Sequence, residues 1–472
     1  MNKVSAVPAK ARSAFDRARA AHVQQGLEEA WTAIGEAVSL APGFPSAAFL
    51  KAQVAFESWR PSVSLFEAAL ELDRSNQLLV RNFILALAAE GQETRAETLL
   101  AGILARNPGW LEGHALLSTL RLTCGQRDPY GSYRAACKAD PSDRALRLAW
   151  FHRLATARDW DGAEGVLEGL EQSQPNGPGV AEARIFLKCE TGRAADDPEI
   201  FAPFSGHSDA GLALAEVRHA LRCGDPRRAE AIASLWTDTA HAPQFWPYRD
   251  LAWRMTGDPR HEWLTGDPAF AAVIETGLAD EELDRLAAFL RSLHRMQAPF
   301  PEQSVQGGTQ TARNLLMHHD PLVAGVRRQL EDAVAAWRDD LPEGGGGHPL
   351  LDRKPADIRF QGSWSVRLAA GGHHRPHIHP HGWASSAFYV ALPKVADGKD
   401  ASQTAIGQFA LGVPPPELGL PLGPERVIDP LQGRLVLFPS TSWHGTLPFS
   451  GEERLTLAFD IAPAGAQGEQ LK

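Results

Sequence analysis

The chain has 472 residues, enough for two or three domains, and its 44% apolar and 22% charged residues are typical of an ordinary soluble protein. The formal net charge of −10, without a strongly basic stripe, argues against a nucleic-acid partner. No apolar signal region or membrane-length run is present, so we expect a cytoplasmic protein without a membrane partner. The four cysteines lack CxxC spacing, which favours buried thiols over disulfides or a zinc site.

The first half of the chain repeats at a spacing of 33 or 34 residues. The marks of the repeat are Pro42, Ser75, Pro108, Pro141 and Pro175. Small and large apolar residues at four-residue spacing precede these marks, as expected for two packed helices ended by proline. The period is that of a tetratricopeptide array, whose unit is about 34 residues. We therefore predict a tetratricopeptide-like α-solenoid over residues 1–264.

Stacked helix pairs form a superhelix with a concave surface. We favour binding of a protein or peptide partner there over a spacer or dimerisation scaffold. From Asp197 to about Gly266 helical patterns continue without the repeat. An aromatic group in this part is predicted to be a buried joint between domains rather than a peptide-binding surface, and its members are Phe245, Trp246, Tyr248, Trp253 and Trp263.

The second half of the chain changes from helical to strand patterns. Residues 279–296 and 321–337 have the periodicity of amphipathic helices. Short strands separated by turn signals, as in a jelly roll, follow at 357–360, 363–369, 385–392, 408–411, 435–438 and 455–461. The segment 412–430, rich in Pro and Gly, is either a lid over a site or an irregular crossover.

Four histidines occur within seven residues, His373, His374, His377 and His379, with His381 close behind. In an extended strand, residues i and i+2 point the same way, so the HxH pair at 377 and 379 can reach one ion. Neutral imidazole binds several transition metals, and the pattern does not say which. For an isolated HxH, a histidine-rich surface loop is the alternative.

Two further features follow the strand at 433–439. His444 comes after a short Ser/Thr turn, and Arg454 begins the last strand. Alternation along that strand predicts one face with Arg454, Thr456 and Ala458, and another with Leu455, Leu457 and Phe459. An arginine that points into a core is costly unless it meets an anion.

The blocks SWSVRL, HIHPHGWASSAFYVALP and LFPSTSWHGTLPF, together with R-x-T ten residues after His444, resemble a bacterial family of 2-oxoglutarate/Fe(II) oxygenases often fused to tetratricopeptide repeats. Residues 303–311 also resemble a stretch upstream of the barrel in that family. The resemblance implies a double-stranded β-helix (jelly roll, cupin-like) with bracing helices over residues 265–472. The chain would then be an α+β multidomain protein.

The resemblance also implies residue roles. The implied metal ligands are His377, His379 and His444, and the implied residues for the distal carboxylate of 2-oxoglutarate are Arg454 and Thr456. We further predict Tyr389 and Arg367 in the cofactor pocket, with Trp383 and Trp443 either lining it or belonging to the core.

One position departs from the family pattern. The usual site has two histidines and one carboxylate, whereas His379 stands where Asp or Glu is expected. A three-histidine site, a carboxylate from elsewhere, and His381 or His374 as the true ligand all stay open.

We therefore predict an Fe(II)- and 2-oxoglutarate-dependent dioxygenase that uses O2 to hydroxylate a protein or peptide side chain docked through the helical repeats. One alternative is a metal cupin of other chemistry, because Gly371–His379 and Gly433–His444 meet both cupin motifs. The cupin glutamate is missing, however, and a cupin leaves the inward Arg454 unexplained. The other alternative is a catalytically inactive tetratricopeptide adaptor with a structural β domain.

Overall fold

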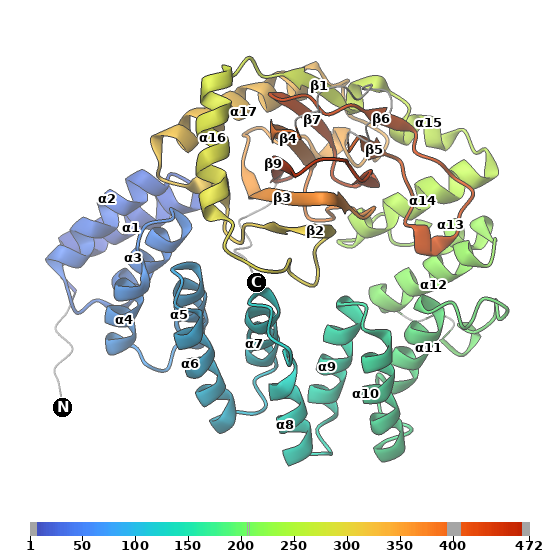
Figure 1. The fold of residues 1–472 in the computed structure, drawn as a ribbon, viewed down its shortest axis with the longest axis horizontal. Helices are drawn as coiled ribbons and strands as arrows, with labels where there is room; N and C mark the ends of the chain where they lie inside the picture. The colour runs from blue at the N-terminus through green and yellow to red at the C-terminus, as the bar shows by residue number, and fades with distance from the viewer. Residues whose placement is uncertain (1–6, 205, 207, 394–406, 465–472) are drawn as a thin grey trace.

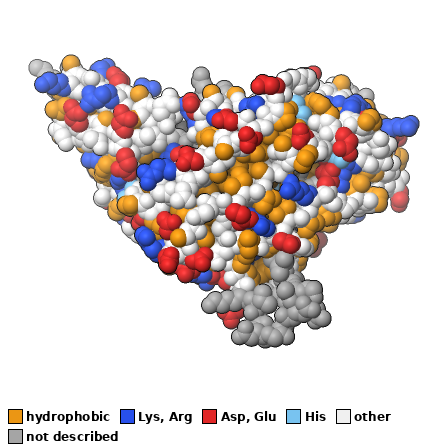
Figure 2. Space-filling model, turned by 90° about the horizontal axis from the view of Figure 1, so that it is seen from above, with side chains coloured by type: hydrophobic (Ala, Val, Ile, Leu, Met, Phe, Trp, Pro, Cys, Tyr) orange, Lys and Arg blue, Asp and Glu red, His pale blue; other side chains and the backbone are white. Residues whose placement is uncertain are grey.

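The computed structural model describes residues 7–204, 206, 208–393 and 407–464. An arch of helices surrounds one side of a β domain that carries its own helices (Figure 1). Within the described ranges, no helix is both long and apolar enough to cross a lipid bilayer. Figure 2 shows basic and acidic side chains interspersed over one face of the molecule, without a continuous basic area on that face.

Helix pairs build the first part of the arch. They are α1 (Ala9–Val23), α2 (Leu27–Leu40), α3 (Pro45–Glu57), α4 (Val63–Leu72), α5 (Gln77–Ala89), α6 (Glu93–Arg106), α7 (Leu111–Thr123), α8 (Gly131–Ala139), α9 (Arg144–Thr156), α10 (Trp160–Ser173) and α11 (Val180–Glu190). α2 ends two residues before Pro42, and α6 ends two residues before Pro108. Proline cannot continue a helix, and the predicted marks are confirmed as the ends of the second helices.

The concave side of the arch is partly filled by the chain itself. The backbone N–H of Gln297 donates to the carbonyl of Thr123 at the end of α7 (3.0 Å). Arg153 on α9 pairs with Glu302 at 3.4 Å. The segment 294–304 of the β domain therefore reaches the inner helices, and only the remaining part of the concave side is available to a partner.

Four more helices complete the arch, namely α12 (Ala210–Arg222), α13 (Pro226–Ser234), α14 (Ala242–Thr256) and α15 (Arg260–Thr265). The side chains of Asp209 and Asp225 accept hydrogen bonds at the first turns of α12 and α13, as good N-caps do. Phe245 and Tyr248 of α14 pack in one cluster with Trp443 of the β domain, as predicted for a buried joint. Trp246 and Trp253 are buried in a second cluster with Leu264, whereas Trp263 is 38% exposed and corrects the prediction at that position. The domain boundary after residue 264 stays a prediction.

The β domain consists of two antiparallel sheets. The larger sheet contains β1 (Ala272–Glu275), β7 (Arg434–Pro439), β4 (Ala384–Ala391), β9 (Glu453–Ile461), β3 (Phe360–His374) and β2 (Val305–Gln310), in this spatial order. The smaller sheet contains β6 (Arg426–Ile428), β5 (Phe409–Leu411) and β8 (His444–Thr446). Tyr389 and Val436 of the larger sheet pack against Phe409 and Ile428 of the smaller one. This is the predicted double-stranded β-helix.

Most predicted strands form, with two corrections. The strand predicted at 357–360 is wrong, because this stretch stays irregular until β3 begins at Phe360. The HxH pair was also expected on a strand, whereas it lies in the connection after β3. Pro376 and Pro380 flank the pair and lack the N–H group that a strand ladder needs.

Two helices cover the outer face of the larger sheet, α16 (Asp280–Leu293) and α17 (Pro321–Asp340), close to the predicted ranges (Figure 1). Leu286 and Leu330 of these helices share one apolar core with Leu455 and Phe459 of β9. The predicted alternation of β9 is confirmed, since every second residue of this strand faces the helices. The side chains between them are turned toward the smaller sheet.

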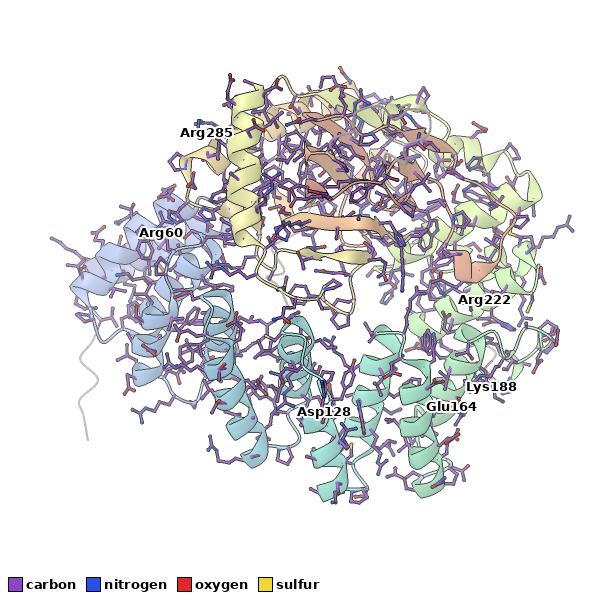
Figure 3. All side chains as sticks on the ribbon, in the orientation of Figure 1. Arg60, Asp128, Glu164, Lys188, Arg222 and Arg285 are labelled. Carbon is purple, nitrogen blue, oxygen red and sulfur yellow. The ribbon has the colours of Figure 1, made fainter. Side chains whose placement is uncertain are left out.

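The segment 412–430 is a crossover fastened to the arch. Its short 3-10 helix η6 (Pro416–Leu418) places Leu418 in the cluster formed by α12 and α14. Arg222 of α12, labelled in Figure 3, donates from Nε to the carbonyl of Glu417 (3.1 Å). Arg254 of α14 donates to the carbonyls of Gly412 and Gly423. The helical domain thus holds the crossover at several points.

Candidate metal centre

Three histidine side chains from two distant segments meet between the sheets. His377 and His379 lie between β3 and β4, and His444 begins β8. One ring nitrogen from each of the three lies within 4.8 Å of the others. The ring centroids of His377 and His444 are 4.1 Å apart, and that of His379 lies 5.0 and 5.2 Å from them. The structure therefore brings together the three predicted ligands.

Backbone hydrogen bonds hold the two segments in register. The N–H of His377 donates to the carbonyl of His444 (2.9 Å), and the N–H of His444 donates back to the carbonyl of His377 (3.1 Å). The N–H of His379 donates to the carbonyl of Ser440 (2.9 Å). His377 and His444 thus form an isolated antiparallel bridge, which fixes the spacing of the predicted ligands although neither residue belongs to a long strand.

Each of the three rings has an acceptor at Nδ1. His377 Nδ1 lies 2.8 Å from the carbonyl of Arg375, and His444 Nδ1 lies 3.0 Å from the carbonyl of Ser442. His379 Nδ1 lies 2.7 Å from Oδ2 of Asp460. A carbonyl or carboxylate oxygen only accepts, so Nδ1 carries a hydrogen in all three rings. Nε2 of His377 is also in contact with the hydroxyl of Ser304 (3.2 Å), and a metal ion bound at this nitrogen would replace that contact. Such outer partners orient metal-binding imidazoles, and the residues fit a divalent transition-metal ion.

Burial keeps the site in the protonation state that a metal requires. It lowers the pKa of His377 and of His444 well below the ordinary value, and the neighbouring imidazoles lower both pKa values further. Both rings are therefore neutral near pH 7. Neutral imidazole is the form that binds a metal ion.

The other histidines of the motif lie outside this group. The ring centroid of His374 is 5.9 Å from that of His377, and its Nδ1 lies 3.0 Å from Oγ of Ser304. Its pKa is lowered to about 3, first by burial and then by the charge of Arg454. His373 is half-buried and His381 is exposed. Of the alternatives for the second ligand, His374 is thus a neighbour of the three rings, and the exposed His381 is not part of the group.

Asp460 is the residue that the sequence analysis missed. Besides His379, its carboxylate accepts a hydrogen bond from Ser385 (2.6 Å). A carboxylate from another segment does reach the site, and it contacts Nδ1 of His379. The alternation of β9 contained a signal for it, because Asp460 has the same parity as Arg454 and Thr456.

Arg454 lies buried on the site-facing side of β9, with only 2% of its surface exposed. Its guanidinium stacks over the ring of Tyr389, 5.0 Å from the centroid, and one nitrogen donates to the carbonyl of Gly407. Among the described residues Arg454 Nε and the hydroxyl of Tyr389 are both buried without a hydrogen-bond partner. Burial lowers the pKa of Arg454 from an ordinary value so high that the group stays charged near pH 7. This arrangement suits an anionic ligand, and Thr456 is buried on the same face.

Arg367 does not belong to this pocket, which corrects its predicted role. It lies opposite Leu455 across the β3–β9 pair and so shares the face that the helices cover. Its side chain is 45% exposed and pairs with Glu453 at 2.5 Å. Glu453 in turn pairs with Arg291 of α16.

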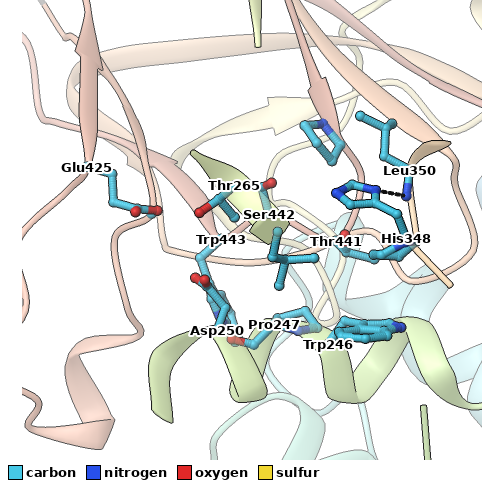
Figure 4. A pocket seen from close by; sticks show the side chains of 14 residues that line it. Trp246, Pro247, Asp250, Thr265, His348, Leu350, Glu425, Thr441, Ser442 and Trp443 are labelled. Carbon is cyan, nitrogen blue, oxygen red and sulfur yellow. Dashed lines mark hydrogen bonds between the residues drawn. The ribbon is translucent and has the colours of Figure 1, made fainter. Parts of the chain in front are cut away.

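The two tryptophans also lie behind the site. The indole N–H of Trp383 donates to the carbonyl of Leu350 within the core under α17. Trp443 is buried against α14 and lines a small pocket there (Figure 4). Asp250 and Ser442 line the same pocket, so it belongs to the joint between the β domain and the helices.

Residues 362–460 match the model of the family described as "Putative 2OG-Fe(II) oxygenase". The matched segment runs from β3 to β9 and contains the three histidines and Arg454. A search of curated proteins gives no significant match.

Several solved structures are similar to parts of the chain. A prolyl-4-hydroxylase from Pseudomonas putida is 18% identical with a TM-score of 0.28, over 42% of this chain and 97% of that one. HygX from Streptomyces hygroscopicus, solved with nickel and 2-oxoglutarate bound, is 15% identical with a TM-score of 0.28, over 43% and 87%. A tetratricopeptide repeat protein from Parabacteroides merdae is 13% identical with a TM-score of 0.32, over 54% and 100%.

Proposed function

We propose that this 2OG-Fe(II) oxygenase chain is an Fe(II)/2-oxoglutarate-dependent dioxygenase that hydroxylates a side chain of a protein or peptide. The observation that carries the proposal is the convergence of one ring nitrogen from each of three imidazoles beside a buried arginine without an anionic partner among the described residues. A metal alone would explain the imidazoles but leave the arginine unexplained. A keto acid with a second carboxylate explains both.

In this proposal His377, His379 and His444 hold the iron, whose bound form supplies electrons for coupling O2 reduction to the oxidative decarboxylation of 2-oxoglutarate. Arg454 binds the distal carboxylate through charge-assisted hydrogen bonds from its guanidinium. The hydroxyls of Tyr389 and Thr456 provide further hydrogen bonds to that carboxylate. The apolar side chains between the two sheets keep water away from the reacting groups.

The Asp460 contact explains how a three-histidine set serves in place of two histidines and a carboxylate. The carboxylate makes His379 a stronger electron donor through its Nδ1 hydrogen bond. Negative charge is then supplied from the far side of the His379 ring instead of by a carboxylate bound to the metal. His379 is therefore assigned as the second ligand.

The proposed substrate is a protein or peptide because a solenoid arch stands beside the site. Burial lowers the pKa of Arg375, next to the ligand pair, and the like charge of Arg158 on the arch lowers it further, while Glu417 of the crossover raises it. Segment 294–304 occupies the concave side near α7 and α9.

The test is an anaerobic titration of the full-length chain with Fe(II) and then 2-oxoglutarate. Chelation of iron by the keto acid gives a visible charge-transfer band, and we expect this band to require both components. Iron binding without the band would favour a cupin of other chemistry. Binding of neither would favour the adaptor. Succinate formation with peptides captured on the chain would then identify the substrate.

A further inference from the structure

Beside each of the two bridged histidines, His377 and His444, lies one residue that faces away from the metal centre. His377 and His444 form the antiparallel bridge, so Ile378 and Trp443 are neighbours across the same bridge on its opposite side. Trp443 is 5% exposed and Ile378 packs against the same cluster. The residues that cover them come from α12 and α14 of the arch.

Trp443 is held by α14 and by the crossover. Its indole N–H donates to the carbonyl of Pro247 (3.2 Å), and its ring meets Tyr248 edge-on at 5.4 Å between centroids. Its own carbonyl accepts from the N–H of Gly412 (2.7 Å), and Gly412 is bonded to Arg254 of α14. The backbone position from which His444 extends is thus fixed by the helical domain.

We propose that the last helices of the arch form a positioning wall for the metal centre, in which α14 sets the geometry of the imidazole ligands through the positioning residues Trp443 and Ile378. This inference rests on the proposed metal site. A ligand placed by a loosely packed backbone binds metal less tightly, because the loop must be ordered at the moment of binding. The short bridge has no long strand to order it, so the wall takes over that role.

A matched pair of substitutions separates positioning from general stability. Leu251 lies in the wall and Leu167 lies in the cluster of α9–α11, and both are fully buried. Leu251→Ala and Leu167→Ala remove the same atoms and should lower the unfolding temperature comparably. Only Leu251→Ala should weaken metal binding. Neither residue belongs to the proposed catalytic or binding machinery.

The readout is Co(II) affinity of the full-length chain, followed by the visible absorption of the bound ion. Supporting partners of metal ligands typically contribute about ten-fold or more in affinity, so we expect about ten-fold weaker Co(II) binding in Trp443→Ala and a smaller loss in Leu251→Ala. Trp443→Phe keeps the aromatic packing and should recover most of the affinity. Leu167→Ala should bind Co(II) as the unmodified chain does, with the same spectrum.

Two outcomes overturn the inference alone. In one, the unmodified chain binds Co(II) and neither Trp443→Ala nor Leu251→Ala changes affinity or spectrum. In the other, Leu251→Ala and Leu167→Ala weaken binding equally, which would show a general loss of folded protein. If the unmodified chain binds no Co(II), the proposed metal site and the positioning wall both fail. Should Trp443→Ala not fold, Trp443→Phe and the two leucine variants still decide.

Discussion

The two ends of the arch contact the β domain in different ways. At the N-terminal end, the indole of Trp59 donates to the carbonyl of Asn314 (2.9 Å) and the amide of Gln25 donates to the carbonyl of Phe360 (2.8 Å). These contacts lie on the helix-covered side of the larger sheet, where Leu27 also joins the core. At the other end, α14 covers Trp443 directly beside His444, a proposed metal ligand. Helices at the two ends of the arch therefore meet different parts of the β domain, the helix-covered core at one end and the proposed metal centre at the other.

The strongest expected effect is loss of the site itself. His444→Ala removes the ligand that joins both segments, and we expect metal binding measured by Co(II) titration to be abolished. His373→Ala is the control, because His373 is half-buried and outside the group of three rings. Equal loss in both variants would contradict the proposed ligand set.

Arg454→Ala should leave metal affinity nearly intact and weaken 2-oxoglutarate binding roughly 100-fold, since removing one partner of a buried charge pair costs about 2–5 kcal/mol. Calorimetric titration of the metal-loaded chain measures this. Arg367→Ala provides the matched control on the other face of the sheet, where the side chain is half-exposed. A similar loss in the control variant would place the keto acid elsewhere.

At the N-terminal contact, Trp59→Ala should reduce the free energy of unfolding by about 2 kcal/mol, because a half-buried indole and its hydrogen bond are lost. Denaturant unfolding measures the change. Metal affinity should stay the same, in contrast to substitutions at α14. If metal affinity also fell in Trp59→Ala, the two ends of the arch would not differ in their effect on the metal site.

Asp460→Asn removes the carboxylate charge from His379 while keeping the shape of the side chain. We expect about ten-fold weaker metal binding with little change in unfolding temperature. Glu453→Gln makes the same chemical change on the outer face and serves as control. Unchanged affinity in Asp460→Asn would remove the proposed substitute for the missing carboxylate ligand.

The smallest expected effect concerns the brace between α16 and the sheet. Burial, with a contribution from Arg367, lowers the pKa of His294 to about 4, and its ring contacts Thr309 and Ser365. Below pH 6.5 the unfolded chain takes up a proton that the folded chain resists, so stability is complete above that pH and is lost as the pH falls toward 4. The loss should be about 1–2 kcal/mol after solvent screening. His294→Gln should flatten this part of a stability–pH profile, and an unchanged profile would assign it to other groups.

Much of the fold followed from local periodicity. The repeat marks located the ends of helices because proline acts within one turn, and the alternation of β9 located the inward Arg454 because strand faces alternate strictly. The prediction that Arg367 lies in the cofactor pocket did not hold, for a different reason. Its face depends on the register of β3 against β9, where it lies opposite Leu455. That register is set by tertiary packing rather than by the strand's own sequence.

Part of the candidate site could likewise be predicted from the sequence, and part could not. The HxH pair and the later histidine are short patterns, so they could be found although they do not lie on regular strands. The contact between Asp460 and His379 joins positions 81 residues apart. Likewise, the wall behind Trp443 depends on a helix about 200 residues earlier in the chain. Alternation can place Asp460 on the inner face of its strand, but no local pattern identifies the partner that it contacts.

A crystal structure of the full-length chain grown with Mn(II) and 2-oxoglutarate would show the metal ligands and the contacts of the keto acid directly. We predict the ion bound to Nε2 of His377, His379 and His444, and the distal carboxylate of the keto acid on the guanidinium of Arg454. Asp460 should stay on Nδ1 of His379. An ion bound by Asp460 with His379 displaced, or a keto acid away from Arg454, would contradict the account.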